Sequence, residues 1–372
     1  MNEAVASPQT FDELRSIVKS ETSILPVGNR TKRPLAADQQ ASLVTLREMN
    51  GILEYEPSEF TFTAYAGTTI TEVSEALQQR QQYLPFDPML IDAGATLGGS
   101  VGAGLSGPGR FRYGGLRDFV LGVKFLSGDG EVINAGGKVV KNAAGFDIPK
   151  LLTGSMGRLG VMTELTFKVF PMPGYSHTLN VACGSLETAM QRMSVAAASS
   201  WELDAIDYRP AAQSIFLRLA GPEKVNQILV KKISDLWGAD VTELTNSAAV
   251  WQSVTALEWS EESRPLAVKV PVHRSVMRPL VDLVGQRTGI DLHLSGAGAV
   301  AWLLCEAQDD VDQLDRFLLE KEVAGLVVRG APTRPNIGSW PRTEISLAVK
   351  QAMDPISKFP RLFHRQSQLH VA

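Results

Sequence analysis

The chain has few of the residues that build inorganic redox centres. Among its 372 residues there are two cysteines, Cys183 and Cys305, and no C-x-x-C pair. Iron–sulfur clusters and structural zinc sites need groups of cysteine or histidine ligands, so neither is expected here. Both cysteines stand in apolar runs, NVACGS and WLLCEA, which predicts buried free thiols.

Histidine is equally scarce. The five histidines are His177, His273, His293, His364 and His370, and none of them forms H-x-H or H-E-x-x-H. We therefore predict no metal site, and we find no Ser-His-Asp or Cys-His arrangement for nucleophilic catalysis. His293 stands beside an apolar strand and is interpreted as a structural residue.

Long apolar runs and excess positive charge are also missing. No run reaches the roughly 18 apolar residues that a membrane-spanning helix needs, and the first ten residues, MNEAVASPQT, lack the basic and apolar regions of a signal peptide. A net charge of −4 gives no electrostatic reason to expect nucleic acid as a partner. These absences predict a cytoplasmic protein, or one that is peripheral to a membrane through a partner.

Glycine, in contrast, is concentrated in one stretch. Residues 94–115, GATLGGSVGAGLSGPGRFRYGG, contain nine of the 32 glycines. The interleaved Ala, Leu and Val argue against a solvated linker. Backbone without side chains can be approached closely by a phosphate or diphosphate.

The stretch contains a formal G-x-G-x-x-G at Gly102, Gly104 and Gly107. A Rossmann site would need a strand before this motif and a helix after it. The following PGRFRYGG is not expected to open a helix, and Asp129, about twenty residues on, lies in an SGDG turn. We therefore expect a dinucleotide site of another architecture.

The rest of the chain predicts an α+β protein of two parts. Capping boxes at Thr10-x-x-Glu13 and Thr69-x-x-Glu72 begin helices, and the pattern of DFVLGVKFLSGDGEVINAGG predicts a hairpin. PMPG at residues 171–174 marks the expected boundary. Beyond it, strands and helices follow the order βαββα twice, as in a repeated ferredoxin-like unit.

Three segments carry a resemblance to a known family. PVGNRTK, the glycine stretch with its continuation GLRDFVLGVKFLSGDGEV, and KNAAGFDIPKLLTGSMGRLGVMTELTFKVFP resemble FAD-binding domains of the vanillyl-alcohol-oxidase type. More narrowly, they resemble the FAD-binding subunits of bacterial glycolate oxidases. The resemblance implies a two-subdomain PCMH-type FAD-binding domain at residues 1–172. A ferredoxin-like α+β cap domain with a C-terminal segment would follow at residues 173–372.

The resemblance also implies the cofactor contacts. In such domains the first loop holds the FAD pyrophosphate, a second segment closes on it, and further glycines and backbone amides lie against the flavin or adenine. The implied residues are Val27, Gly28, Asn29, Arg30, Thr31, Thr96, Gly98, Gly99, Gly107, Gly114, Gly160, Val161 and Met162.

The resemblance also bears on how FAD is attached to the protein and on which group carries the redox chemistry. The first loop has Asn29 and Arg30 where relatives with covalent flavin have a histidine, so FAD is expected to be non-covalent. Lys138, Lys141 and Asn142 are polar and near the expected site, either as cofactor contacts or as a solvated loop. The catalytic residues are not identified, because the cofactor would carry the redox chemistry.

Three functions remain open. The first is the FAD-binding subunit of a glycolate oxidase complex, working with a catalytic flavoprotein subunit and an iron–sulfur subunit. The second is a free-standing FAD-dependent oxidoreductase for a small 2-hydroxy acid. The third is a non-catalytic structural subunit on a flavin fold. The first is favoured, since a chain without cluster motifs must pass its electrons to a partner.

Overall fold

The first sheet is small and parallel. The computed structural model describes residues 5–36, 41–137, 146–330, 335–341 and 343–361. Three short strands pair in the order β1-β3-β2, namely β1 (Val5–Ala6), β3 (Ser42–Thr45) and β2 (Ile24–Val27). Helix α1 (Phe11–Ser20) starts at Thr10, whose side chain accepts from the Glu13 amide as its capping box predicts.

A second, antiparallel sheet forms the core of the N-terminal part. Its order is β4-β5-β9-β7-β8, with β4 (Ile52–Glu56), β5 (Thr61–Tyr65), β9 (Val161–Lys168), β7 (Val120–Leu126) and β8 (Val132–Gly136). The predicted hairpin is therefore confirmed as β7 and β8. Helix α2 (Ile70–Gln78) begins at the predicted cap Thr69 and buries Ile70, Val73 and Leu77. Helix α5 (Ile148–Leu152) is capped by Asp147.

The glycine stretch is more helical than its composition predicts. Leu97–Ala103 forms α3, which starts at Thr96 and ends at Gly104 with φ +62°. The expectation that PGRFRYGG does not open a helix is wrong, because Arg110–Tyr113 form one turn, α4. Pro108 precedes that turn, where its missing N–H costs no helical hydrogen bond.

The C-terminal part is built on one antiparallel sheet, the cap sheet, in the order β14-β11-β13-β12-β16-β17-β15-β18-β19. Its strands are β11 (Tyr175–Ala182), β12 (Ala205–Arg209), β13 (Ser214–Gly221), β14 (Val241–Glu243), β15 (Leu266–Pro271), β16 (Ile290–Ser295), β17 (Val300–Cys305), β18 (Ala324–Arg329) and β19 (Asn336–Gly338). Its helices are α6 (Leu186–Ala198), α7 (Glu223–Trp237), α8 (Ser247–Ala256), α9 (Arg274–Gly285) and α10 (Gln308–Glu320). The predicted order of elements is thus present twice.

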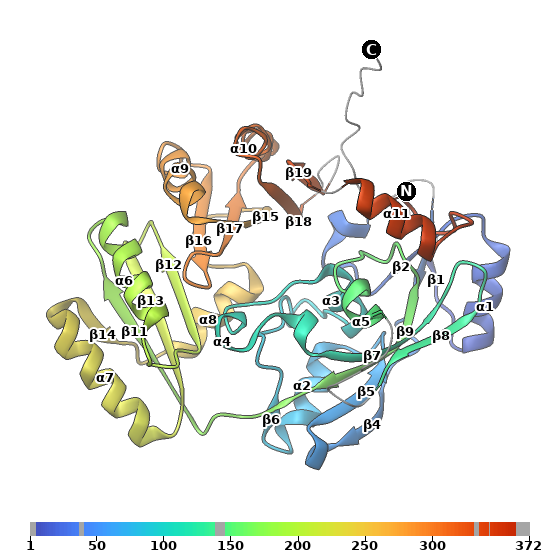
Figure 1. Cartoon of the computed structure of the whole chain (residues 1–372), viewed down its shortest axis with the longest axis horizontal. Coiled ribbons are helices and arrows are strands. Elements are labelled where there is room, and N and C mark those ends of the chain that lie inside the picture. Colours follow the sequence, from blue (N-terminus) through green and yellow to red (C-terminus); the bar gives the residue numbers. More distant parts are fainter. Residues whose placement is uncertain (1–4, 37–40, 138–145, 331–334, 342, 362–372) are drawn as a thin grey trace.

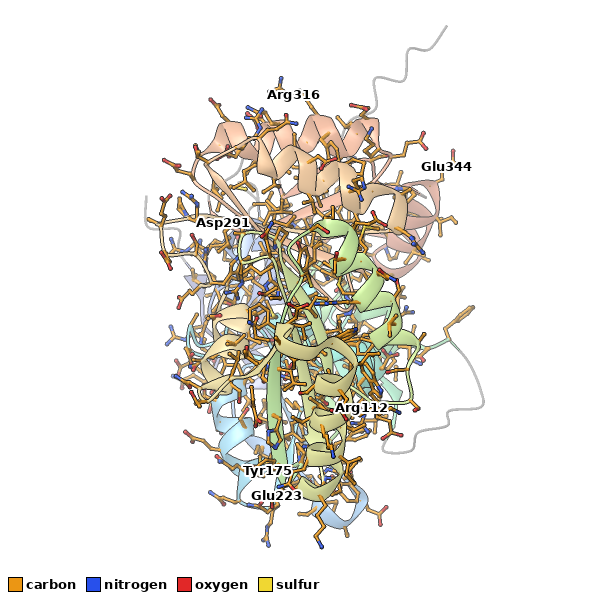
Figure 2. All side chains as sticks on the ribbon, turned by 90° about the vertical axis from the view of Figure 1, so that its left-hand side faces the viewer. Arg112, Tyr175, Glu223, Asp291, Arg316 and Glu344 are labelled. Atoms are coloured by element: carbon orange, nitrogen blue, oxygen red, sulfur yellow. The ribbon has the colours of Figure 1, made fainter. Side chains whose placement is uncertain are left out.

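The two faces of this sheet have different neighbours. Helices α6, α7, α9 and α10 lie on the side away from the N-terminal part (Figure 1). Figure 2 looks onto that side, with Glu223 of α7 near the bottom and Arg316 of α10 near the top. On the opposite face, Trp302, Leu304, Leu326 and Val328 belong to the same buried cluster as the N-terminal core.

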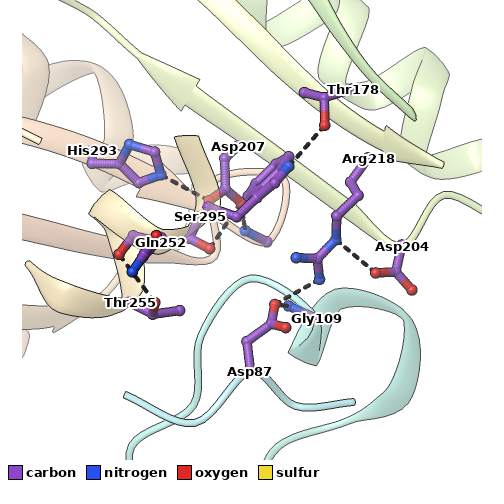
Figure 3. Close-up of polar contacts among 12 residues, drawn as sticks. Asp87, Gly109, Thr178, Asp204, Asp207, Arg218, Gln252, Thr255, His293 and Ser295 are labelled. Atoms are coloured by element: carbon purple, nitrogen blue, oxygen red, sulfur yellow. Dashed lines mark hydrogen bonds and ion pairs between the residues drawn. The ribbon is translucent and has the colours of Figure 1, made fainter. Parts of the chain in front are cut away.

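A buried ion pair joins the two parts (Figure 3). Arg218 of β13 donates from Nη2 to Asp87 Oδ2 at 2.6 Å and from Nε to Asp204 Oδ2 at 2.7 Å. The same Asp87 oxygen accepts the Gly109 amide at 2.7 Å. The loop that carries Asp87 is therefore fixed to both the glycine stretch and the cap sheet.

The end of the described chain returns to the N-terminal part. After α11 (Thr343–Met353), Asp354 is buried and accepts from Lys350 Nζ and from the amides of Lys358 and Phe359. Phe359 joins the N-terminal core, and the Ile24 amide donates to the Lys358 carbonyl. Strand β2 is therefore held on one side by β3 and on the other by this terminal segment.

The fold class is confirmed as α+β. Two antiparallel sheets and one small parallel sheet form the layers, and the cap sheet carries α6, α7, α9 and α10 on one face. Among the described helices, none has the length and apolar character that a membrane crossing requires.

Candidate functional site

A pocket that is partly open to solvent lies in the N-terminal part, and its empty space of about 750 Å³ includes some of that solvent. Three segments form most of its wall, namely the β2 loop, α3 with its cap, and the loop before β9. The lining residues are Pro26, Val27, Gly28, Asn29, Arg30, Thr31, Lys32, Leu35, Leu46, Ala66, Thr96, Gly98, Gly99, Gly102, Ala103, Met156, Gly157, Gly160 and Met162.

The β2 loop and the start of α3 touch at a glycine. A Cβ added at Gly28 would stand 2.2 Å from Thr96 Oγ1. Thr96 is itself buried and uses that hydroxyl to accept the Gly99 amide at 3.1 Å. The Asn29 side chain donates to the Gly94 carbonyl at 2.7 Å. The two predicted segments, 68 positions apart in the chain, are thus in direct contact.

The loop before β9 completes the wall. The Gly154 amide donates to the Val101 carbonyl and the Met156 amide to the Gly102 carbonyl, so this loop is attached to the end of α3. Gly157, at φ +71°, lies so close to β2 that a Cβ would stand 2.9 Å from the Pro26 carbonyl oxygen. Side-chain-free positions therefore let three backbones meet around one space.

One cation in this wall has no carboxylate partner among the described residues. Lys32 is 7% exposed, and its Nζ donates to Thr31 Oγ1 at 3.0 Å. Burial lowers the pKa of Lys32 to about 8, because a charged ammonium is poorly solvated inside the protein. A buried ammonium of this kind is stabilised by an anionic ligand.

The structure brings together ten of the thirteen predicted contact residues. Those that do not line the pocket are Gly107, Gly114 and Val161. Gly107 donates its amide to the Phe86 and Asp87 carbonyls, Gly114 ends α4, and Val161 is buried at the start of β9. As cofactor contacts all thirteen stay predictions. Lys138, Lys141 and Asn142 lie outside the described residues.

Several lining residues were missed from the sequence. Lys32 directly follows Thr31 in PVGNRTK, and Met156 and Gly157 belong to GSMG. These residues therefore lie inside segments on which the family resemblance already rested. The apolar residues Leu35, Leu46 and Ala66 had no such signal, because only the packing of separate strands brings them to one wall.

The wall suits FAD, an elongated molecule with an anionic diphosphate at its centre. Backbone amides and the Thr31 hydroxyl are hydrogen-bond donors for phosphate oxygens, and the Lys32 ammonium supplies positive charge. The flat rings would meet Leu35, Leu46 and Met162. The residues present therefore fit this cofactor.

The cap sheet contains a second buried polar group. His293 Nε2 lies 2.7 Å from Asp207 Oδ2, and both side chains are fully buried (Figure 3). Asp207 Oδ1 also accepts from Ser295 Oγ and the Gly296 amide. In the described part of the chain no three His, Cys, Asp or Glu side chains converge as metal ligands would. Cys183 and Cys305 are buried and free, as predicted.

Comparison with known proteins identifies the N-terminal part. Residues 2–136 match the model of a family described as an FAD binding domain. Along the whole chain, the glycolate oxidase subunit GlcE of Escherichia coli K12 is 28% identical over 367 residues, covering 96% of this chain and 97% of that protein.

Other relatives match over about half of the chain. The glycolate oxidase subunit GlcD of Bacillus subtilis is 30% identical over 200 residues, which cover 52% of this chain and 42% of GlcD. A D-2-hydroxyglutarate dehydrogenase of Xanthomonas citri is 27% identical over 194 residues, covering 50% of this chain and 41% of the dehydrogenase. The chain thus spans about two-fifths of the length of these two relatives.

A solved structure agrees with the fold. Alkyldihydroxyacetonephosphate synthase superposes with a TM-score of 0.70 at 15% identity, over 96% of this chain and 76% of the synthase. This likeness concerns the fold alone. The chain is a flavoprotein whose residues 2–136 are similar to the FAD binding domain family, and it resembles a bacterial glycolate oxidase subunit along nearly its whole length.

Proposed function

We propose that the chain is the FAD-binding subunit of a glycolate oxidase complex, which oxidises glycolate to glyoxylate. The observation that carries the proposal is the pocket, where side-chain-poor backbone from three segments surrounds a buried lysine that has no carboxylate partner in the described chain. The similarity to GlcE along 96% of the chain supports the same assignment.

In this proposal each segment has a task. The loop of residues 27–31 and Lys32 hold the diphosphate, while Thr96, Gly98 and Gly99 keep α3 close enough to close the wall. Bound FAD would supply two-electron redox chemistry. The protein contributes binding and orientation, and none of the described residues in the pocket wall is a histidine or cysteine that could bond the flavin covalently.

The partners follow from the electron balance. Glycolate loses two electrons and two protons on becoming glyoxylate, and these must leave the flavin before the next turnover. The two cysteines of this chain are buried and far apart in the sequence, and neither is among the described residues that line the pocket. We therefore propose a catalytic flavoprotein subunit and an iron–sulfur subunit as partners, with any membrane association made through them.

The purified chain is expected to be yellow and to release FAD on acid precipitation. Anaerobic glycolate is expected to bleach its flavin spectrum in the reconstituted complex. Bleaching of the isolated chain to the same extent and rate would instead favour a free-standing oxidoreductase. A colourless chain that takes up no FAD would contradict the proposal and favour a structural subunit.

FAD affinity is expected to fall as the pH rises above about 8. In the FAD-free chain the pKa of Lys32 is lowered to about 8 by burial. The diphosphate favours the charged form, so above this pH binding must take up a proton. The apparent Kd should be constant from about pH 6.5 to 7.5. It should then rise by up to about tenfold per pH unit, as measured by quenching of FAD fluorescence.

Two variants test the origin of this pH dependence. Lys32→Met should bind FAD more weakly at about pH 7 and should lose the rise above about pH 8. Lys19→Met, a matched change at an exposed lysine of α1, should retain it. A rise of equal size in Lys32→Met would assign the titration to another group.

A further inference from the structure

The outer surface of α7 carries exposed aliphatic side chains. Val225, Ile228 and Leu236 are 49%, 68% and 54% exposed. With about 3.6 residues per turn, these positions and Lys232 lie within about 80° of one another around the helix axis. Single exposed aliphatic residues are ordinary, but several on one helix face indicate a contact surface. We call these four residues the α7 stripe.

The α7 stripe is turned away from the neighbouring helix α6. On the other flank of α7, the Trp237 ring lies 5.6 Å from the Arg192 guanidinium of α6. The stripe therefore points toward β14, the outermost strand on this side of the cap sheet. Figure 1 shows α7 and β14 at the end of the molecule opposite α1 and β2.

The sheet edge beside the α7 stripe is open in the described part of the chain. Strand β11 pairs along all its eight residues with β13, but β14 meets it only at residues 179–181. Tyr175, at the open end of β11, is 40% exposed, and its carbonyl accepts from Asn226 Nδ2 of α7 at 3.3 Å. Figure 2 shows Tyr175 and Glu223 at the same end of this face. Open edges invite pairing with other chains and are usually covered. The stripe and the edge therefore form one continuous surface.

The charges beside the α7 stripe select an acidic protein as partner. Lys224, Lys231 and Lys232 are exposed and make no ion pair among the described residues. Ammonium groups that border an apolar contact are complementary to carboxylates, which speed association and fix the register. An anionic lipid surface fits less well, because the carboxylates of Glu223 and Asp235, near the two ends of α7, would face its headgroups.

A second copy of this chain also fits the α7 stripe poorly. Two α7 helices related by a two-fold axis run antiparallel. Pairing Ile228 with Leu236 then places Lys232 directly opposite its own copy. Pairing Val225 with Leu236 brings Lys231 and Lys232 of both copies within about one helical turn of each other. Repulsion between like charges opposes both registers, so a helix of a different subunit fits better.

We propose that the α7 stripe and the open edge of β11 bind a helix of the catalytic flavoprotein subunit, whose own apolar stripe is bordered by Asp or Glu. This inference rests on the proposed function, which supplies the partner subunits. The iron–sulfur subunit has to approach a flavin to accept electrons, whereas α7 lies at the end of the molecule opposite the β2 side of the FAD pocket (Figure 1). A contact at α7 therefore suits a subunit that is held in place without reaching this chain's cofactor.

The first test is calorimetric titration of the FAD-loaded chain into the purified catalytic flavoprotein subunit. Ile228→Asp should raise the Kd of this complex by roughly 30-fold or more, as expected for a central apolar contact of an interface. Ile345→Asp, the same change at an isoleucine of α11 that is 60% exposed, should leave the Kd unchanged. FAD content and thermal midpoint are measured for every variant, so that misfolding is recognised.

The second test concerns the charges. Wild-type affinity should fall as the salt concentration rises, because exposed ion pairs are screened. The double variant Lys231→Glu, Lys232→Glu should bind about tenfold more weakly at low salt and should lose this salt dependence. Lys19→Glu, a charge reversal on α1, should retain both the affinity and its salt dependence. If Ile228→Asp unfolds, the double lysine variant decides.

The outcomes separate this inference from the proposed function. Wild-type affinity in Ile228→Asp, or an equal loss in Ile345→Asp, overturns the docking surface even if the complex oxidises glycolate. Unchanged salt dependence in the double lysine variant overturns the acidic helix as occupant.

Two further measurements address the other occupants. Light scattering that shows a dimer of the isolated chain, or its flotation with phosphatidylglycerol vesicles, overturns the proposal if Ile228→Asp abolishes it. Absence of any complex with the wild-type chain contradicts the partners of the proposed function as well, so the two failures are distinguishable.

Discussion

Gly28→Val is expected to weaken FAD binding strongly while the cap sheet stays folded. The new Cβ would overlap the Thr96 hydroxyl, because Thr96 Oγ1 lies only 2.2 Å from the position that the Cβ would take. Thr96 cannot rotate away without giving up the cap that it provides to the Gly99 amide. Overpacking of this kind costs about 1–3 kcal/mol. At about 1.4 kcal/mol per decade this amounts to a loss of roughly 5- to 150-fold in affinity.

A matched control and a graded series make this result specific. Gly174→Val adds the same side chain where a Cβ meets nothing within 4 Å, and it should bind FAD normally. Gly98→Val should also lose FAD, because its Cβ would lie 2.8 Å from Ala66 Cβ and 3.0 Å from the Ala66 carbonyl oxygen. Gly99→Val should be milder, with one contact at 3.0 Å. Normal FAD titration of Gly28→Val would disprove the site assignment.

Asp354→Ala is expected to lower the stability of the FAD-binding part by about 3–5 kcal/mol, the usual result of breaking a buried ion pair. Asp354 is 1% exposed and accepts three hydrogen bonds, from Lys350 Nζ at 2.6 Å and from the amides of Lys358 and Phe359. Its loss leaves the Lys350 ammonium buried without a counter-charge.

The effect should extend to FAD. Lys350 Nζ also donates to the Arg158 carbonyl, and the Arg158 guanidinium donates to the carbonyls of Met156 and Leu35, two residues of the pocket wall. Thermal unfolding followed by FAD fluorescence should show a lower midpoint and earlier release of the cofactor. Asp282→Ala, at a carboxylate on the outer helix α9, serves as control. An unchanged midpoint for Asp354→Ala would show that the terminal segment does not support the pocket.

Local signals in the sequence were sufficient for much of the fold. The caps at Thr10, Thr69 and Asp147 begin helices where their side chains satisfy free amides, which needs only neighbouring residues. The β7–β8 hairpin and the repeated order of the cap sheet follow from alternation and turn residues in the same way. The family resemblance named both segments that meet at Gly28 and Thr96.

What could not be predicted depends on distant contacts. The glycines of α3 looked like exposed backbone, but Gly98 and Gly102 lie on helix faces that pack against Ala66 and Gly157. Helix propensity disfavours glycine, and tertiary packing overrides that preference here. Lys350 and Asp354 have helical spacing, but their role rests on the Arg158 carbonyl, 192 residues away.

The return of residues 354–361 to β2 has a consequence for biosynthesis. The loop that carries Arg158 gains two of its supports, the Lys350 ammonium and the Arg361 carbonyl, from residues 192 and 203 positions later in the chain. Domains usually fold in the order in which the ribosome delivers them, but here the pocket is translated long before the segment that supports it. Cofactor loading of this flavoprotein is therefore expected to wait for the synthesis of residues 350–361.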